Sequence, residues 1–492
     1  MLSKSKYVSG RQCLKKLYFE KHRPELKAPV SAALQARFDQ GHTVGALAQK
    51  LYPGGKDATP ESYSNFAPSI EQTRRWINSG YEVIYEATFA EEGVLAMLDI
   101  FLKRDGFIYA LEVKSSTKVK DYHVWDAAIQ YYVMEKAGFR PDRFYIVHLN
   151  RNYVKQGDIR VDELFTKVNI TEDVLALQAD IPQELAEMKS TLKAGEEPDV
   201  DIGAHCSTPF ACDFVHHCWQ HVPSPSVFEL YRAGAKAWGF YERGQLALAD
   251  LDESQFHGRA RLQIEGAKYG REVIRRDKIA AWLATADYPL YFLDFETTGM
   301  SLGIPVYDGT RPYQQIPVQY SLHVLEHPNA SLQHYEYLPD FSQDPREALA
   351  EALCAQIGAA GSVVAYFKGF ESGCLNHLAE CFPHLADRLV SIRDRLFDLI
   401  EPFQKSWLYK PAMGGSASIK SVYPALFPGQ EGYQGLIINN GGDASRFLAE
   451  LAKGTVRGSA EEKEQLRQDL LAYCKLDTEA MVKIWRYLEG LQ

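Results

Sequence analysis

A buried strand that ends in two carboxylates constrains this chain more than any other stretch. Residues 291–299 read YFLDFETTG, in which an apolar, β-prone run leads into Asp294 and Glu296. Side chains two apart on a strand point to the same face, so both acids are presented side by side. Carboxylates this close repel each other unless a cation lies between them, and hard oxygen ligands suit Mg²⁺ or Mn²⁺. The alternative is a strand that ends at the protein surface in a solvent-exposed acidic turn.

The acid pair resembles the first motif of the DnaQ-type proofreading exonucleases, which have a ribonuclease H-like fold. The resemblance implies a third acid after a later strand. A strand predicted at SVVAY is followed by Phe370 and Glu371, where the family usually has Phe-Asp. A glutamate can also ligate a metal, but its longer arm changes the geometry.

The same resemblance implies a fourth acid on a late helix, four residues after a general base. The run EQLRQDLLAYCKLDTEAMVKIWRYL supplies Tyr473 and Asp477, a spacing that puts both on one helical face. The implied chemistry is two-metal phosphodiester hydrolysis, in which Tyr473 helps position the attacking water. The implied metal ligands of this centre are Asp294, Glu296, Glu371 and Asp477.

A second carboxylate pattern surrounds a hairpin in the first half of the chain. GVLAMLDIFLKRDGFIYALEVKSS reads as strand, turn, strand, with Asp105-Gly106 as a strong hairpin signal. Asp99 lies towards the end of the first strand, whereas Glu112 and Lys114 share one face of the second. Asp99 and Glu112 can hold a divalent metal that lowers the pKa of bound water, and Lys114 can orient that water. The arrangement resembles the core of the PD-(D/E)xK nuclease fold.

A predicted helix follows the hairpin and contains Gln130. It resembles the Gln-containing motif of the RecB-type branch of these nucleases, in which the Gln contacts DNA or orders the site. Met134 stands where that branch usually has a Tyr, so the resemblance carries over Gln130 only. Glu86, on the strand before the hairpin, is a further candidate acid.

Three cysteines recur in the segment GAHCSTPFACDFVHHCW. Cys206, Cys212 and Cys218 are each separated by five residues, and a neighbouring histidine could complete a structural zinc site. In the CRISPR-associated RecB-like nucleases, which this half resembles, one cysteine before the core and three after it bind a [4Fe–4S] cluster. The resemblance implies that Cys13 joins these three as a ligand. The cluster would then link the beginning of the domain to its end. The spacing is wider than usual in that family, so zinc is the alternative.

Charge and hydropathy limit the classes of partner. The formal net charge of −10 argues against non-specific coating of nucleic acid but allows a local basic groove. We find no apolar run of about 18 residues and no signal-peptide core, so we expect a cytoplasmic protein without membrane contact. In that compartment the eight cysteines are expected to be thiols or metal ligands rather than disulfides.

A chain of 492 residues should hold two or more domains. We predict an α/β protein with a PD-(D/E)xK restriction-endonuclease-like domain over 1–222, a helical connector over 223–288 and a ribonuclease H-like DnaQ-type domain over 289–492. Nearly the whole chain resembles a bacterial family that fuses a RecB-type nuclease to a DnaQ-like domain.

This resemblance implies a Mg²⁺- or Mn²⁺-dependent DNA nuclease with two active sites, acting on single-stranded or end-containing DNA in repair, recombination or defence. Two alternatives remain open. One is an RNA exonuclease. The other is a nucleic-acid-binding protein in which only one centre is catalytically active. Because Glu371 replaces the usual aspartate of the family motif, the second centre is the one more expected to be inactive.

Overall fold

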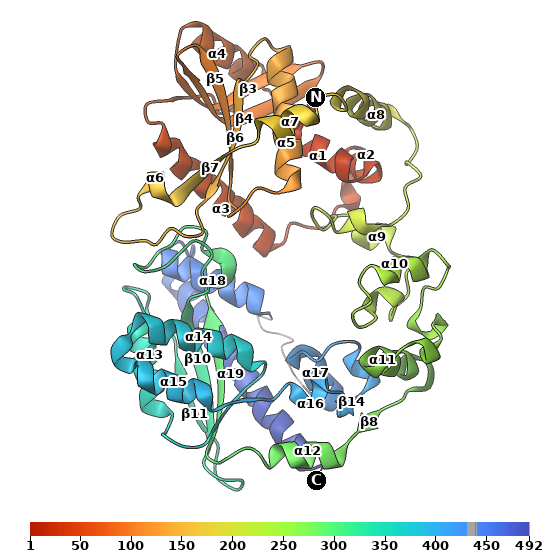
Figure 1. Ribbon diagram of the computed structural model, residues 1–492, viewed down its shortest axis with the longest axis vertical. Coiled ribbons are helices and arrows are strands. Elements are labelled where there is room, and N and C mark those ends of the chain that lie inside the picture. Colours follow the sequence, from red (N-terminus) through yellow and green to blue (C-terminus); the bar gives the residue numbers. More distant parts are fainter. Residues whose placement is uncertain (431–437, 439, 492) are drawn as a thin grey trace. The chain divides into compact units, whose positions relative to one another are not determined.

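The structure is a computed structural model that describes residues 1–430, 438 and 440–491 (Figure 1). It is a mixed α/β protein of two compact units. The first unit comprises residues 1–221 and 303–313, and the second comprises 222–302 and 314–492. The segment predicted as a helical connector therefore belongs to the second unit.

The first unit contains a seven-stranded sheet of order β2-β3-β4-β5-β6-β7, with β1 beside β4. β4 and β5 are antiparallel, whereas β5 and β6 are parallel. The predicted hairpin is confirmed, since Asp105 and Gly106 both have positive φ, as the tightest hairpin turn requires. The strands are β1 (Leu2–Ser3), β2 (Lys56–Asp57), β3 (Val83–Glu91), β4 (Val94–Arg104), β5 (Phe107–Lys114), β6 (Arg143–Leu149) and β7 (Phe165–Asn169).

Helices cover both faces of this sheet. Leu98 and Phe101 pack in a core with Ala127 of α5, whereas Leu111 on the opposite face packs with Val44 of α3. The helices are α1 (Lys4–Gln12), α2 (Leu14–His22), α3 (Ala32–Ala48), α4 (Ala67–Asn78), α5 (Asp121–Lys136), α6 (Val161–Leu164), α7 (Thr171–Ala176), α8 (Ile181–Lys193) and α9 (Val215–Cys218).

The sequence predicts one helix over 171–195 and a basic amphipathic helix in the stretch REVIRRDKIAAWL, and the structure differs from both predictions. The helix expected over 171–195 is broken into α7 and α8, because Pro182 lies in the first turn of α8 and proline does not continue a preceding helix. The basic helix expected over REVIRRDKIAAWL begins only at Arg276. The β-branched pair Val273-Ile274 instead forms β8, which pairs with β14 (Leu408–Tyr409).

The second unit contains a five-stranded sheet of order β11-β10-β9-β12-β13. The central strand β9 is antiparallel to β10 and parallel to β12. The strands are β9 (Leu290–Thr297), β10 (Pro317–Leu325), β11 (Gln333–Tyr337), β12 (Ser362–Ala365) and β13 (Leu396–Asp398). The helices are α10 (Lys236–Tyr241), α11 (Gly258–Tyr269), α12 (Arg276–Leu283), α13 (Arg346–Gln356), α14 (Lys368–Cys381), α15 (Ala386–Asp394), α16 (Glu401–Gln404), α17 (Ile419–Leu426), α18 (Gly441–Lys453) and α19 (Ala460–Glu489).

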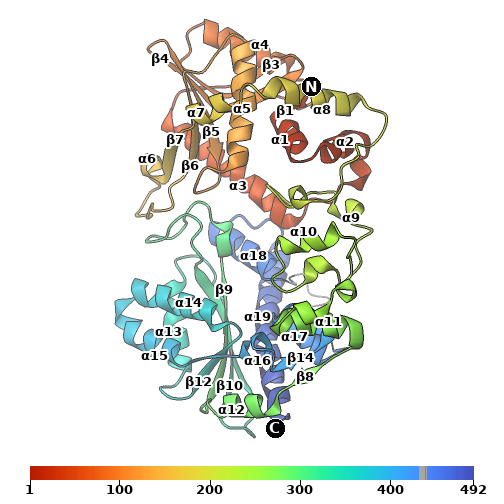
Figure 2. The ribbon, with the colours of Figure 1, turned by 45° about the vertical axis from the view of Figure 1, so that its right-hand side comes forward.

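This sheet lies between two helical layers, with α13, α14 and α15 on one side and α19 on the other (Figure 2). Successive side chains of β9 therefore point alternately to the two helical layers. Tyr291 and Leu293 pack in the core of the α13–α15 layer, whereas Leu290 and Phe292 pack with Trp485 of α19. Because strand residues two apart share a face, Asp294 and Glu296 continue the face that α19 covers.

Trp485 is the centre of the aromatic packing between α19 and the sheet. Its ring lies 6.1 Å from that of Phe292, 5.6 Å from that of Phe397 and 6.0 Å from that of Trp282, centroid to centroid. Trp485→Ala should therefore lower the free energy of unfolding by about 3–5 kcal/mol, since it empties a close-packed core. Urea unfolding followed by circular dichroism measures this. The control Tyr335→Ala, at an exposed position on β11, should change little; equal effects would contradict the assignment.

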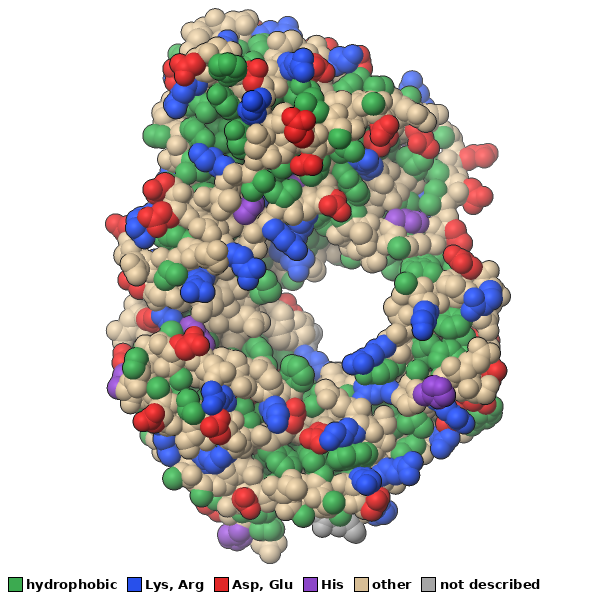
Figure 3. All heavy atoms as spheres, viewed as in Figure 1, with side chains coloured by type: hydrophobic (Ala, Val, Ile, Leu, Met, Phe, Trp, Pro, Cys, Tyr) green, Lys and Arg blue, Asp and Glu red, His purple; other side chains and the backbone are tan. Residues whose placement is uncertain are grey.

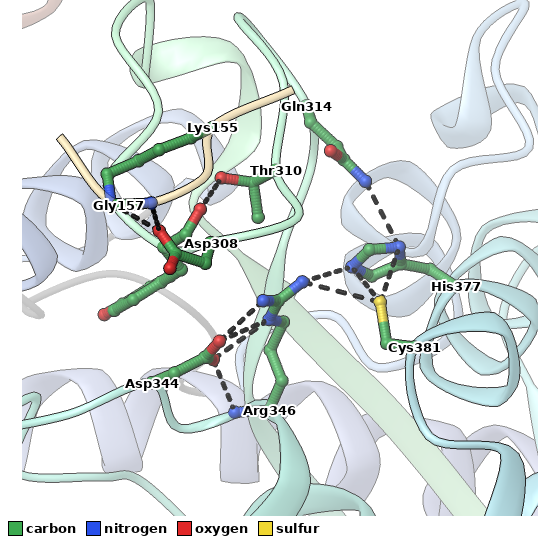
Figure 4. A network of polar contacts seen from close by, with 10 residues as sticks. Lys155, Gly157, Asp308, Thr310, Gln314, Asp344, Arg346, His377 and Cys381 are labelled. Atoms are coloured by element: carbon green, nitrogen blue, oxygen red, sulfur yellow. Dashed lines mark hydrogen bonds and ion pairs between the residues drawn. The ribbon is translucent and has the colours of Figure 1, made fainter. Parts of the chain in front are cut away.

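Residues 303–313, predicted to lie in the ribonuclease H-like domain, pack within the first unit. The Asp308 Oδ1 accepts hydrogen bonds from Lys155 Nζ at 2.6 Å and from the Gly157 N–H at 3.1 Å (Figure 4). The Lys155 N–H donates to the Thr310 carbonyl at 3.0 Å. The first unit is thus completed by residues that follow β9 in the chain.

Charged side chains are interspersed over both units on the face shown in Figure 3, where basic and acidic groups alternate. Among the helices of the described residues, none combines the length and the apolar composition needed to span a bilayer.

Candidate active sites

Three carboxylates converge in the second unit. Oxygens of Asp294 and Glu296 on β9 and of Asp477 on α19 lie within 4.8 Å of one another. β9 and α19 pack face to face through the core described above, and this packing brings the three groups together. The structure thus joins two predicted strand acids with the predicted helix acid.

The electrostatics of this cluster disfavour three ionised carboxylates. Burial, then Asp477 and Glu296, raises the pKa of Asp294 well above its usual value. Burial and Asp477 likewise raise the pKa of Glu296, and Lys420 opposes that increase. A divalent cation relieves such repulsion, and clustered carboxylate oxygens are the ligands that Mg²⁺ and Mn²⁺ prefer. The donor set therefore fits the predicted metals.

Glu371 lies beside this cluster without joining it. It is buried in the first turn of α14, and its charge raises the pKa values of Asp294 and Glu296. Burial raises its own pKa to about 8, with a smaller contribution from Asp398. Its Oε2 has no hydrogen-bond partner among the described residues. Glu371 is thus a buried acid that interacts electrostatically with the site but lies outside the group of three whose oxygens meet.

Asp398, which ends the apolar run of β13, supports the helix that carries Glu371. Its Oδ1 accepts hydrogen bonds from the backbone N–H groups of Phe367 at 3.0 Å and Lys368 at 3.3 Å. These groups open α14, where orphan N–H groups need an acceptor. Asp398 therefore caps α14.

A pocket with about 890 Å³ of atom-free space, here called the acidic pocket, is lined by Asp294, Glu296 and Asp477. Tyr473 and Lys420 also line it, and Lys420 Nζ donates to the Tyr473 hydroxyl at 3.1 Å. Burial, then Asp477, raises the pKa of Tyr473, so its hydroxyl stays protonated. Tyr473 thus faces the pocket as a neutral hydrogen-bonding group.

Cys474 belongs to the scattered cysteines of the C-terminal half, for which the sequence predicts ordinary thiols. The structure places its Sγ 3.6 Å from Asp294 Oδ2, as a donor to that carboxylate. Burial, then Asp294, raises the pKa of this thiol. Its position between Tyr473 and the late acid on α19 is the signal that could have identified it.

In the first unit, Glu112 and Lys114 lie together on the α5 side of β5. Glu112 Oε1 accepts hydrogen bonds from Lys114 Nζ and Lys4 Nζ, each at 2.7 Å. Lys114 also pairs with Asp126 of α5. Burial would raise the pKa of Glu112, but the two ammonium groups hold it below its usual value. Lys4, which lies 108 positions from Glu112 along the chain, carries no local signal in the sequence.

Asp99 lies on β4, next to β5 in the sheet. Its Oδ2 accepts a hydrogen bond from the Val113 N–H at 2.5 Å. The strand register places Glu86 opposite Asp99, and Glu86 has a φ of 51°. Burial, then Glu112, raises the pKa of Asp99, and burial raises that of Glu86 to about 7. Left-handed backbone at a non-glycine residue stores strain, which proteins concentrate at functional sites.

Gln130 lies on α5 one turn after Asp126, on the same helical face. It is fully buried, and neither its amide nitrogen nor its amide oxygen has a hydrogen-bond partner among the described residues. Buried amide groups are normally paired, because an unpaired one loses its hydration without compensation. The side chain is therefore suited to a partner that joins the site from outside.

The four predicted cysteine ligands line one cavity, with about 340 Å³ of atom-free space. Cys13 lies at the junction of α1 and α2, and the others come from the segment between α8 and the end of the first unit. Burial raises the pKa of Cys218 to about 11, and Cys212, Cys206 and Cys13 add to that increase. The four cysteines share this cavity, but they are not among the described groups whose ligand atoms lie within 4.8 Å of one another.

One protein family matches part of the chain. It is a domain of unknown function (DUF2779), and the match covers residues 291–418. The matched region includes Asp294, Glu296 and Glu371 but ends before Lys420, Tyr473 and Asp477. The comparison with curated proteins gave no match.

Proposed function

We propose that this protein is a metal-dependent nuclease with two active sites that hydrolyse phosphodiester bonds in DNA. The observation that carries the proposal is the convergence of Asp294, Glu296 and Asp477, all within 4.8 Å at one pocket. Repelling carboxylates are retained where they hold metal ions, and the pocket beside them can admit a substrate.

In the second unit we assign a 3′–5′ exonuclease centre of the ribonuclease H-like class. Metal ions held by Asp294, Glu296 and Asp477 would activate water and stabilise the leaving oxygen. Tyr473, kept protonated and bonded to Lys420, would hold the attacking water or a phosphate oxygen by hydrogen bonding. The Glu371 carboxyl, which favours its protonated form, would be recruited as a ligand once a cation offsets the cost of ionising it.

In the first unit we assign a RecB-type PD-(D/E)xK centre. Asp99 and Glu112 would hold its metal ion, which lowers the pKa of bound water. Lys114, fixed by Glu112 and Asp126, would orient that water or the scissile phosphate. Gln130 would supply the unused buried amide to the same substrate or water.

The four thiols of the first unit would hold a [4Fe–4S] cluster, with zinc as the alternative. The group would be structural, since it joins α1 and α2 to the segment that closes the unit. No step of phosphodiester hydrolysis needs it.

The test compares the full chain with Asp99→Ala and Asp294→Ala on single-stranded and duplex DNA with Mn²⁺. We expect hydrolysis that EDTA abolishes, and a loss of about 10³-fold or more in the activity of whichever centre is changed. Loss in one variant alone would identify a single live centre. An RNA strand cut faster than DNA would favour the RNA exonuclease, and unchanged hydrolysis in the double variant would contradict the proposal.

A further inference from the structure

A second cavity adjoins the acidic pocket within the second unit. It has about 1400 Å³ of atom-free space, and Tyr366 and Ile419 line both cavities. Tyr366 is fixed there, because its hydroxyl donates to the Ala417 carbonyl at 2.7 Å. The second cavity, here called the side groove, therefore leads into the acidic pocket past a shared aromatic wall.

The side groove is cationic, in contrast to the acidic pocket. Arg232 and Arg259 line it, and the charged or ionisable neighbours of Arg259 are Tyr231, Tyr366, Tyr409 and Arg232 rather than carboxylates. Arg259 donates to the Phe403 carbonyl, which anchors it. Lys405 also lines the groove but is paired with Glu401. Two guanidinium groups thus remain for an anionic ligand.

Aromatic rings accompany these cations. The guanidinium carbons of Arg232 and Arg259 lie 5.2 Å and 4.7 Å from the centre of the Tyr231 ring. Phe367, which is 54% exposed, lines the same groove at the start of α14. Arg232 and Phe367 both have left-handed backbone, with φ of 55° and 79°. Such strain persists where surrounding structure imposes it, as at ligand sites.

The wall formed by residues 229–232 is held in place. The Tyr231 N–H donates to Gln263 Oε1, and Gln263 Nε2 donates to the Glu229 carbonyl, both at 2.7 Å. A side chain at Gly415 would come within 3.0 Å of Gln263 Nε2 and of the Glu229 carbonyl. Because the chain at Gly415 packs closely against this wall, Tyr231 and Arg232 are held in position before any ligand arrives. This lowers the entropic cost of binding.

We propose that the side groove binds a single strand of nucleic acid and leads its end into the acidic pocket. The inference rests on the proposed exonuclease function of that pocket. Arg232 and Arg259 contact backbone phosphates, and the rings of Tyr231 and Phe367 stack on bases, the combination typical of single-strand binding. The segment 223–288, predicted as a helical connector, thereby supplies substrate-binding residues.

The test uses two substrates in the full chain carrying Asp99→Ala, which silences the first unit. The p-nitrophenyl ester of thymidine 5′-monophosphate reaches only the acidic pocket, whereas an oligodeoxythymidine of about 15 nucleotides also fills the groove. Arg232→Ala and Phe367→Ala should each lower kcat/KM on the oligonucleotide about 10- to 100-fold and leave hydrolysis of the small ester unchanged. Arg457→Ala, which removes an exposed arginine that lines neither cavity, is the matched control.

Equal losses of kcat/KM on both substrates, or no loss on either, would overturn the proposal that the side groove binds a single strand. Hydrolysis of neither substrate by the parent protein would contradict the nuclease proposal instead. The groove is then tested by fluorescence anisotropy of the same labelled oligonucleotide in EDTA. Binding weakened about tenfold by Arg232→Ala but not by Arg457→Ala supports the groove, and equal affinity of the two variants overturns it.

Discussion

Replacing Asp294 with asparagine should make the metal-free protein more stable while abolishing hydrolysis of nucleic acid at the acidic pocket. Burial, Asp477 and Glu296 raise the pKa of Asp294 in the folded chain above the value of the unfolded chain. Between these two values the folded state binds more protons, so stability falls as the pH rises through that window. Asparagine removes this effect, and we expect a gain of about 1–2 kcal/mol at pH 7 in EDTA.

The sign can be checked by varying pH and metal. Below about pH 3, where the aspartate is protonated in both states, the gain should disappear, because unfolded aspartate titrates near pH 3.9. Mn²⁺ should stabilise the parent more than Asp294→Asn, since the variant lacks one ligand of the acidic pocket but keeps the site proposed at Asp99 and Glu112. Differential scanning calorimetry in EDTA and in Mn²⁺ measures both effects.

A matched control variant, Asp340→Asn, should show neither the gain in stability nor the loss of hydrolysis. Asp340 is exposed, and its hydrogen bonds with the N–H and hydroxyl of Ser342 lower its pKa. Asp340→Asn should therefore give no gain at pH 7 and leave hydrolysis intact. A destabilised Asp294→Asn protein would contradict the metal-site assignment. So would a variant that, in a chain also carrying Asp99→Ala, keeps more than about a hundredth of the activity of the Asp99→Ala parent.

Cys206→Ser should remove the metal centre of the first unit. All four cysteines line one cavity, so the loss of one thiolate opens the ligand set. We expect the anaerobically purified parent to absorb near 400 nm and to carry about four irons per chain, and the variant to carry fewer than about one. The first unit should also unfold more readily, because the bound group stabilises only the folded state.

Cys354→Ser is the matched control, since Cys354 lies on α13 of the second unit, away from the cavity. It should retain the absorbance and the iron. A parent protein with about one zinc and no iron, lost in Cys206→Ser but kept in Cys354→Ser, would identify the zinc alternative. Metal lost equally in both variants, or absent from the parent, would contradict the proposed centre.

Local periodicity predicted the parts of the sites that lie on single elements. Alternation along YFLDFETTG placed Asp294 and Glu296 on one face, and the Asp105-Gly106 turn fixed the hairpin that presents Asp99, Glu112 and Lys114. These features depend on backbone geometry within a few residues, which a single sequence displays directly.

Features set by distant packing were not predictable in this way. Lys4 reaches Glu112 only because β1 pairs with β4, and no local spacing encodes that pairing. The association of residues 303–313 with the first unit likewise depends on contacts such as that between Lys155 and Asp308. The connector contains few long elements, so periodicity gave no sign of the groove that it forms.

The chain's path through the two units determines when the first one can be finished during synthesis. It passes between them at 221–222, 302–303 and 313–314. Ile304 and Tyr313 pack in the core beside Val44, and the Tyr313 hydroxyl bonds to Gln40 at 2.7 Å. The ribosome must therefore translate β9 of the second unit before it delivers the residues that close the first. A nascent chain that ends near residue 222 lacks Ile304 and Tyr313, so this part of the core is completed only after β9 has been translated.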